Sequence, residues 1–243
     1  MKLLKAAVAC ALSGTIMLGG CASGPGSSPA PAPPSAAVTN APAAPAVETA
    51  KPSLPWSTEW TELFNGRDLS NWAVTDFVAH GPVKVESEQI KLGAGAIMTG
   101  INWTNGALPK TDYEISLEAL KSDGVDFFCG LTFPVGDSYC SLILGGWGGA
   151  VAGLSSLDDL DASENETSKH MFFEVGRWYA VRMRVTTAKI EAWVDHEKIV
   201  DVGIAGRKVS LRPGPIEFCK PLGLATYQTG AAARDFKLRL TKP

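Results

Sequence analysis

Positive charge, histidine and sulfur are all scarce in this chain of 243 residues. Its 22 lysines and arginines are outnumbered by 25 aspartates and glutamates, which gives a net charge of −3. Proteins that bind nucleic acid usually carry a basic face, so this balance argues against a nucleic-acid partner. The 3 histidines have no neighbours at metal-ligand spacing, and no GxSxG motif marks a serine nucleophile. The common zinc and serine-hydrolase patterns are therefore absent.

Cysteine occurs five times, but few of these residues are available for chemistry. Cys10 lies in an N-terminal leader and Cys21 directly follows it, which leaves Cys129, Cys140 and Cys219 for a folded domain. An odd number leaves at least one thiol unpaired, and no CxxC spacing suggests zinc. Because free cysteine often behaves as a compact apolar side chain, we predict that all three lie in the core.

The first 20 residues are typical of a secretory signal peptide. Lys2 and Lys5 precede an apolar run over residues 6–18, and small residues lead up to Cys21. A cysteine at this place predicts a bacterial lipoprotein whose thiol is lipidated and whose mature chain begins there. The alternative is an ordinary signal peptide, or a short anchor, with an incidental cysteine. The run is shorter than the roughly 20 residues that span a bilayer.

The leader predicts a lipid-anchored protein of the bacterial envelope, outside the cytoplasm. Because Ala22, and not aspartate, follows the cysteine, we expect the outer membrane. Residues 21–55 are rich in proline, alanine and serine and contain few large apolar side chains, so they are expected to form a disordered linker. The folded domain is expected over residues 56–243.

That domain has the pattern of an all-β protein. Residues 113–119 and 178–186 alternate between apolar and polar side chains, as half-buried strands do. Two hairpins are predicted, over residues 126–144 and 189–202, and a last strand over residues 234–240 is expected to close one sheet. No stretch has the pattern of an amphipathic helix. We therefore expect a sandwich of two antiparallel sheets. The predicted inward side chains are Tyr113, Ile115, Leu117, Ala119, Tyr179, Val181, Met183 and Val185.

Residues 63–72 read LFNGRDLSNW, which resembles the opening motif of the 3-keto-disaccharide hydrolase domain family. Weaker matches follow in the family's order, and the resemblance covers most of residues 63–240. It implies a concanavalin A-like jelly-roll β-sandwich and hydrolysis of the glycosidic bond of 3-keto-disaccharides. The centre departs from the family pattern, because Phe128 and Pro134 stand where many members have asparagine and arginine. Tyr139 is retained on the next strand, and Glu118 matches a family acidic position.

If the family activity holds, the chemistry needs three groups. A ketone at C3 of the sugar acidifies the C2 hydrogen, so a base removes it and the C1 substituent is expelled before water adds. An enolate donor and an acid for the leaving group complete the set. The candidates are Asp126, Glu118, Tyr139 and His170. No cofactor is implied.

Saccharide-binding candidates are aromatic and small polar residues. Trp147 lies within Gly145-Gly-Trp-Gly-Gly149 and is either a platform for a sugar ring or a plug at one end of the sandwich. Strict alternation places Phe128 and Thr132 on the same face as Asp126, which forms either a ligand groove or a solvent-facing surface. Arg182 either holds a sugar hydroxyl or pairs with glutamates on neighbouring strands.

An acidic loop over residues 158–166 carries five carboxylates. Asp159, Asp161 and Glu164 are calcium candidates, because hard cations need several oxygens. The loop lacks the glycine and spacing of an EF-hand, so a solvated acidic loop is the alternative. No other metal site is indicated.

Three functions remain open after the sequence alone. The first is an envelope-anchored, carbohydrate-active hydrolase whose partner is a carbohydrate or oxidised sugar. The second is a non-catalytic glycan-binding or envelope-interaction module on the same fold, which the altered central strand favours. The third is a structural lipoprotein without a ligand.

Overall fold

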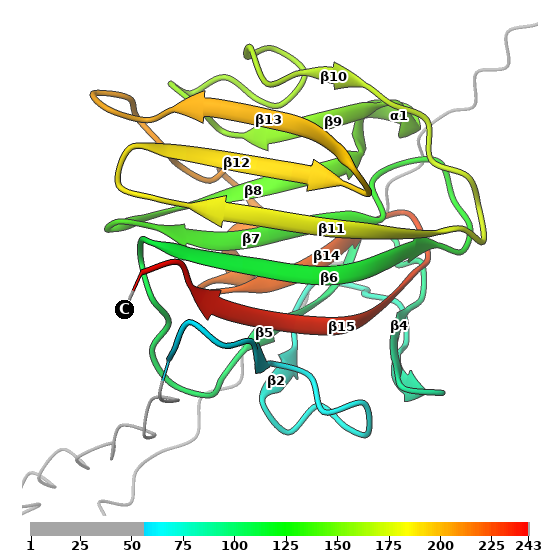
Figure 1. The fold of residues 1–243 in the computed structure, drawn as a ribbon. Coiled ribbons are helices and arrows are strands. Elements are labelled where there is room, and N and C mark those ends of the chain that lie inside the picture. The colour runs from blue at the N-terminus through cyan, green and yellow to red at the C-terminus, as the bar shows by residue number, and fades with distance from the viewer. Residues whose placement is uncertain (1–55, 243) are drawn as a thin grey trace, which may run out of the picture. The chain divides into compact units, whose positions relative to one another are not determined.

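The computed structural model describes residues 56–242, which form a sandwich of two antiparallel β-sheets (Figure 1). The predicted signal peptide, the predicted lipidation site Cys21 and the whole of the predicted linker lie outside these residues. The only helical segments described are the short turns α1 (Gly146–Gly149) and η1 (Pro215–Cys219). Among residues 56–242, no helix is long and apolar enough to cross a membrane. The two antiparallel sheets confirm the predicted all-β class.

One sheet, here called sheet A, faces the viewer in Figure 1. Neighbouring strands are hydrogen-bonded in the order β13-β12-β11-β6-β15-β4-β3, and β1 also pairs with β15. The bounds are β1 (Thr61–Glu62), β3 (Val83–Glu86), β4 (Gln89–Leu92), β6 (Tyr113–Lys121), β11 (Trp178–Val185), β12 (Lys189–Val194), β13 (Glu197–Gly203) and β15 (Ala231–Leu240).

The second sheet, sheet B, lies behind it with the order β10-β9-β8-β7-β14-β5-β2 (Figure 1). The bounds are β2 (Trp72–Val74), β5 (Met98–Trp103), β7 (Cys129–Val135), β8 (Ser138–Gly145), β9 (Val151–Ser155), β10 (Lys169–His170) and β14 (Gly223–Tyr227).

The predicted alternation places the expected side chains in the core. β6 and β11 pair over their whole common length, from Tyr113 opposite Val185 to Leu120 opposite Trp178. All eight side chains predicted to face inward are buried, because a period of two sends every second residue to the shared interior. Both predicted hairpins are confirmed as β7–β8 and β12–β13.

The last strand differs from its prediction. β15 begins at Ala231 and lies between β6 and β4, so it is an interior strand and does not close an edge. Its ladder with β6 is interrupted between Arg234 and Lys237, where Asp235 adopts a φ of 51°. This bulge turns Phe236 into the core against Trp72, at 4.8 Å between ring centroids.

The LFNGRDLSNW motif builds the start of the domain and has a structural role. Asn65 accepts hydrogen bonds from the amides of Arg67 and Asp68 and donates to the carboxylate of Asp68, which closes a tight loop. The buried indole of Trp72 then donates to the carbonyl of Leu63 at 2.9 Å. The motif therefore holds the N-terminal segment against the core.

One side-chain hydrogen bond joins the two sheets through the core. The fully buried hydroxyl of Tyr113, on β6, donates to the carbonyl of Pro134, on β7, at 2.5 Å. Desolvation by burial raises the pKa of this phenol well above its ordinary value, so the hydroxyl stays a donor across the usual pH range.

Tyr113→Phe should lower the free energy of unfolding by about 1–2 kcal/mol, because the carbonyl of Pro134 loses its buried partner. Urea unfolding measures the change. Tyr139→Phe is the matched control, since that half-buried ring makes no hydroxyl hydrogen bond within residues 56–242. Equal midpoints for the two variants would contradict a structural role for the Tyr113 hydroxyl.

Candidate functional site

A cleft of about 610 Å³ lies on the outer face of sheet B, the face turned away from sheet A. Its floor is formed by side chains that alternate with core residues, among them Ser141 and Ile143 on β8 and Ser155 on β9. One wall is residues 212–216, which lead into η1, and the other is residues 126–127 with Trp147. Most of this lining is apolar, as in typical small-molecule sites.

Asp126 and Trp147 are the two predicted site residues that the structure brings together. Both line the cleft, and they are joined through the backbone of the α1 turn. Oδ2 of Asp126 accepts a hydrogen bond from the amide of Gly148 at 3.1 Å, and Oδ1 accepts one from the amide of Phe127 at 2.8 Å. Each oxygen keeps lone-pair capacity for a further partner.

Trp147 projects from a strained turn. Its backbone is left-handed, with a φ of 49°, and the flanking Gly145 and Gly148 also have positive φ. A tryptophan rarely adopts this conformation, so the contacts of the turn must stabilise it, and the bond from Gly148 to Asp126 is one of them. The side chain is 39% exposed, which agrees with a platform at the cleft rim more than with a buried plug.

The opposite wall contributes Arg212. Its guanidinium carbon lies 5.9 Å from the centre of the Trp147 ring, and Nη1 is 3.2 Å from the carboxylate of Asp161. Asp161 also accepts hydrogen bonds from the hydroxyls of Ser155 and Ser156. The acidic loop therefore anchors the arginine at the cleft.

Ion pairs also hold the other carboxylates of the acidic loop. Asp159 pairs with Lys208, and Asp158 and Glu166 both pair with Arg207. Hydrogen bonds from the amide of Lys208 and from Arg207 hold the pKa of Asp158 below its ordinary value.

The loop does not have the geometry expected of a calcium site. Asp159 and Asp161 have cationic partners, and within residues 56–242 the carboxylate of Glu164 bonds only the amide of Asp161. Across residues 56–242, no group of three or more histidine, cysteine or acidic side chains has metal-binding geometry. The calcium prediction is therefore corrected to a loop held by ion pairs.

The assignment of Phe128 to the ligand face is wrong. Phe128 is fully buried, and its ring packs against Phe173 at 5.0 Å. Strict alternation fails here because β7 begins only at Cys129, so Phe128 and Cys129 are consecutive core residues. The neighbouring Phe127 lines the cleft instead.

Gly130, on β7, leaves space for an aromatic ring of the cleft. A Cβ at this position would lie 2.9 Å from the ring of Phe127 and 3.2 Å from the carbonyl of Ala225. The glycine therefore makes room for Phe127, whose ring also packs on Tyr227 at 5.8 Å, and not for a substrate backbone contact.

Three more predicted residues belong to sheet B but do not line the cleft. Thr132 is fully buried and shares a hydrogen bond of 2.9 Å with the hydroxyl of Ser141. The ring centre of Tyr139 lies 6.0 Å from the ammonium of Lys220, and the residue is not part of the cleft lining. His170 is exposed on the short edge strand β10, opposite Val151.

Glu118 and Arg182 lie on the other sheet. Glu118 bonds the guanidinium of Arg234 at 2.5 Å, and Arg182 bonds Glu114 at 3.2 Å on the outer face of sheet A. The structure therefore does not bring either residue to Asp126. The alternative explanation, cross-strand ion pairing, describes both.

Sequence reasoning missed Phe127, Tyr227, Arg212 and the wall at residues 213–216. The only sequence signal for the wall is the run Pro213-Gly-Pro215, which marks a turn and carries no chemistry. These residues come from separate parts of the chain, so their meeting depends on the pairing of β7, β8 and β14.

The domain is similar to several known proteins. A family model described as 3-keto-alpha-glucoside-1,2-lyase-like domain matches residues 59–238. No curated protein sequence matches the chain. Among solved structures, the apo Crh5 transglycosylase is 8% identical, with 80% of this chain and 88% of that chain covered and a TM-score of 0.51.

Two further solved structures are similar at lower scores. A glycosyl hydrolase family protein from Mycobacterium fortuitum is 9% identical, with 75% of this chain and 99% of that chain covered and a TM-score of 0.47. The carbohydrate-binding module CBM66 from Bacillus subtilis is 10% identical, with 71% and 97% covered and a TM-score of 0.45. At these identities, the similarity concerns the fold.

All three cysteines of the described domain are free and buried, as predicted. Desolvation by burial raises the pKa of Cys129, Cys140 and Cys219 to about 12. Since the thiolate is the reactive form, none of these thiols is suited to act as a nucleophile near neutral pH.

In the folded protein, these three thiols should not react with a chromogenic disulfide reagent at pH 8, because a raised pKa keeps them protonated and burial blocks access. Denaturant should expose three additional reactive thiols in the same sample. Fewer than three additional thiols would contradict the free, buried state of the cysteines.

Proposed function

The chain belongs to the family of 3-keto-alpha-glucoside-1,2-lyase-like domains, and from this membership we propose that its cleft binds an oxidised saccharide and cleaves the glycosidic bond of a 3-keto-disaccharide. The observation that carries this proposal is the pairing of Asp126 with Trp147 at one cleft, linked through the amide of Gly148. A proton-accepting group and an aromatic ring thus face the same space.

The cleft has the chemistry that a sugar ring requires. Trp147, Phe127 and Tyr227 offer aromatic surface to the apolar C–H face of a sugar. Ser141 and Ser155 on the floor offer acceptor oxygens to sugar hydroxyls, and Arg212 on the wall offers donors to hydroxyl and carbonyl oxygens. A saccharide that enters the cleft would therefore meet an apolar platform and a polar rim.

In the proposed reaction, Asp126 removes the proton from C2 of a sugar that carries a ketone at C3. The C–H electron pair forms the C2–C3 double bond of an enolate, and the oxygen at C3 accepts a hydrogen bond from Arg212. The ketone then re-forms as C1 and C2 become doubly bonded and the C1–O bond breaks. The protonated Asp126 returns its proton to the departing oxygen. Water then adds to C1, with its proton taken up at C2.

A non-catalytic glycan-binding module on the same fold is the second candidate. The observation that favours it is that Asp126 is the only carboxylate among the described residues that line the cleft. Direct hydrolysis of a glycoside commonly uses two carboxylates across the bond, so this cleft fits either the ketone-dependent elimination above or binding alone.

Asp126→Asn should reduce cleavage of a 3-keto-disaccharide by about 10²–10⁴-fold, since the base is lost. Release of reducing sugar measures the rate, and calorimetry with the same saccharide measures binding. Trp147→Ala should mainly raise KM, by about tenfold, because it removes ring contact. Asp137→Ala, on the exposed β7–β8 turn, is the matched control and should leave both values unchanged.

Two results would decide against the enzymatic proposal. Full activity of Asp126→Asn would remove this residue from the chemistry. Saccharide binding by the unaltered protein that depends on Trp147, without any cleavage, would establish the binding module in place of the enzyme.

We further propose that the protein is attached to the bacterial outer membrane by a lipid on Cys21. The support is the leader of Lys2, Lys5 and the apolar run before Leu18-Gly19-Gly20-Cys21. The linker of residues 22–55 would extend by up to ~3.1 Å per residue and hold the domain away from the membrane.

Cells grown with a clickable palmitate analogue should label this protein through Cys21. Cys21→Ser should abolish the label and move the protein into the soluble fraction. The control Cys10→Ser, inside the predicted leader, should leave the labelling of Cys21 unchanged. A fully labelled Cys21→Ser variant would contradict the anchor.

A further inference from the structure

A second hollow, of about 450 Å³, lies on the outer face of sheet A, away from the cleft of sheet B. It is bounded by side chains from β6, β11 and β15 and by Thr58, Thr241 and Lys242. The proposed function does not use it.

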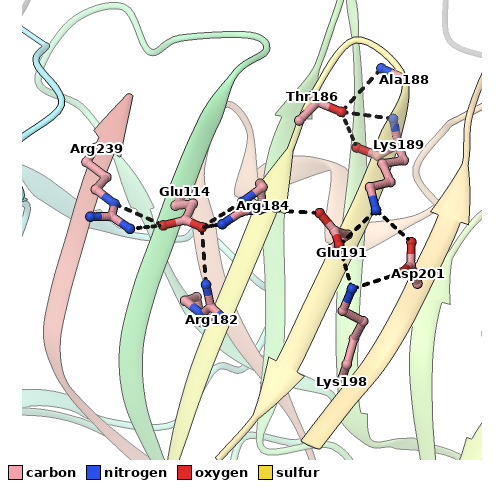
Figure 2. A network of polar contacts seen from close by, with 10 residues as sticks. All are labelled: Glu114, Arg182, Arg184, Thr186, Ala188, Lys189, Glu191, Lys198, Asp201 and Arg239. Atoms are coloured by element: carbon pink, nitrogen blue, oxygen red, sulfur yellow. Dashed lines mark hydrogen bonds and ion pairs between the residues drawn. The ribbon is translucent and has the colours of Figure 1, made fainter. Parts of the chain in front are cut away.

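The buried carboxylate of Glu114 organises this surface (Figure 2). Glu114 is fully buried although it faces outward, and three arginines cover it. Arg239 donates from Nε and Nη2 to Oε2, at 2.9 and 2.6 Å, and Arg184 bonds Oε1 from Nε at 2.7 Å. Burial alone would raise the pKa of Glu114, but the bonds from Arg239 and Arg184 outweigh it and hold the pKa below its ordinary value.

Positive charge is in excess here. One carboxylate serves three guanidinium groups, with Arg182 as the third at 3.2 Å. In the adjacent part of the network, Lys189 and Lys198 are balanced by Glu191 and Asp201 (Figure 2). The network as a whole therefore carries a net charge of about +2, which favours a negatively charged ligand on this face.

The arginines are also held in fixed positions by aromatic rings. Arg182 lies over the ring of Trp193, 3.9 Å from its centre, and Arg239 lies over Trp60 at 4.5 Å. The strand register places Arg184, Glu114 and Arg239 in one row across β11, β6 and β15. Because the guanidinium groups are already ordered, a ligand would lose little side-chain entropy when it binds them.

Unused donors face the hollow. A guanidinium has five N–H donors. On Arg239, Glu114 engages Nε and Nη2 and leaves Nη1 without a partner within residues 56–242, whereas all three nitrogens of Arg184 contact Glu114 or Glu191. Thr241, which also lines the hollow, has a buried Oγ1 that makes no hydrogen bond within residues 56–242. An acceptor oxygen placed in the hollow would satisfy the free donors of Arg239.

We propose that this surface binds the carboxylates of an acidic glycan, one with a uronic acid in each repeat. Planar guanidinium groups match carboxylates in a two-point geometry, and the exposed Thr58, which also lines the hollow, offers a hydroxyl to a neighbouring sugar oxygen. Cations on successive strands are spaced by one or two strand widths, roughly 5–10 Å, so they suit charges repeated along a polymer. The site is independent of the cleft and of the reaction proposed there.

Titration of the purified protein with oligogalacturonate tests this site by calorimetry. Binding should weaken as salt is raised, because the contact is charge-based. The fully methyl-esterified oligomer, which has the same sugar chain without charge, should not bind. Arg239→Gln should weaken binding about tenfold or more, while Arg182 and Arg184 keep Glu114 paired and the domain folded.

Two matched variants complete the design. Lys208→Gln removes one exposed positive charge beside Asp159, outside this surface, and should leave the affinity unchanged. Trp147→Ala alters the cleft alone and should also leave it unchanged, so failure of the cleft proposal is distinguishable from failure of this one.

Three outcomes would overturn the proposal. Equal binding of the methyl ester would show that binding does not depend on the carboxylate charge. Full affinity of the Arg239→Gln variant would show that the glycan binds outside this surface. Arg239-dependent binding to vesicles of anionic phospholipid, with no binding of oligogalacturonate, would assign the surface to a membrane in place of a glycan.

Discussion

The rest of the structure depends on the burial of two sheet faces against each other. Each strand gives alternate side chains to the shared core, where Tyr113, Trp72 and Phe236 lie between the sheets. The side chains on the two outer faces do not pack in this core, so the residues that these faces carry can differ completely. Sheet B carries small and aromatic residues that form a cleft, and sheet A carries an ionic network.

The cleft depends on a second constraint, a turn that its own sequence does not favour. Trp147 has a left-handed backbone, and the carboxylate of Asp126 bonds the amide next to it. Arg212 reaches the same ring from the opposite wall, held by Asp161. A residue proposed as a base thus also orders the proposed binding platform, and any change to it affects both geometry and charge.

Strands with long, regular alternation were predictable because one physical rule governs every residue in them. β6 and β11 match their predictions residue by residue. The predicted side-chain faces were wrong where the chain does not alternate regularly between buried and exposed residues. Residues 126–128 precede β7, so Phe127 and Phe128 exchange their expected faces. The bulge in β15 and its interior position depend on the partner strands, which the local pattern does not specify.

The sequence by itself determined the all-β class, the inward faces of the regular strands, the buried thiols and two residues of the cleft, Asp126 and Trp147. The inward faces follow from period-two burial and the buried thiols from the apolar character of free cysteine, whereas Asp126 and Trp147 were chosen for their side-chain chemistry and for the glycines around the tryptophan. Only the tertiary structure decided that Glu118 and Arg182 lie on one sheet and Asp126 on the other. It also brought Arg212 and Tyr227 to the cleft, because strand order and loop contacts join residues that no local pattern relates.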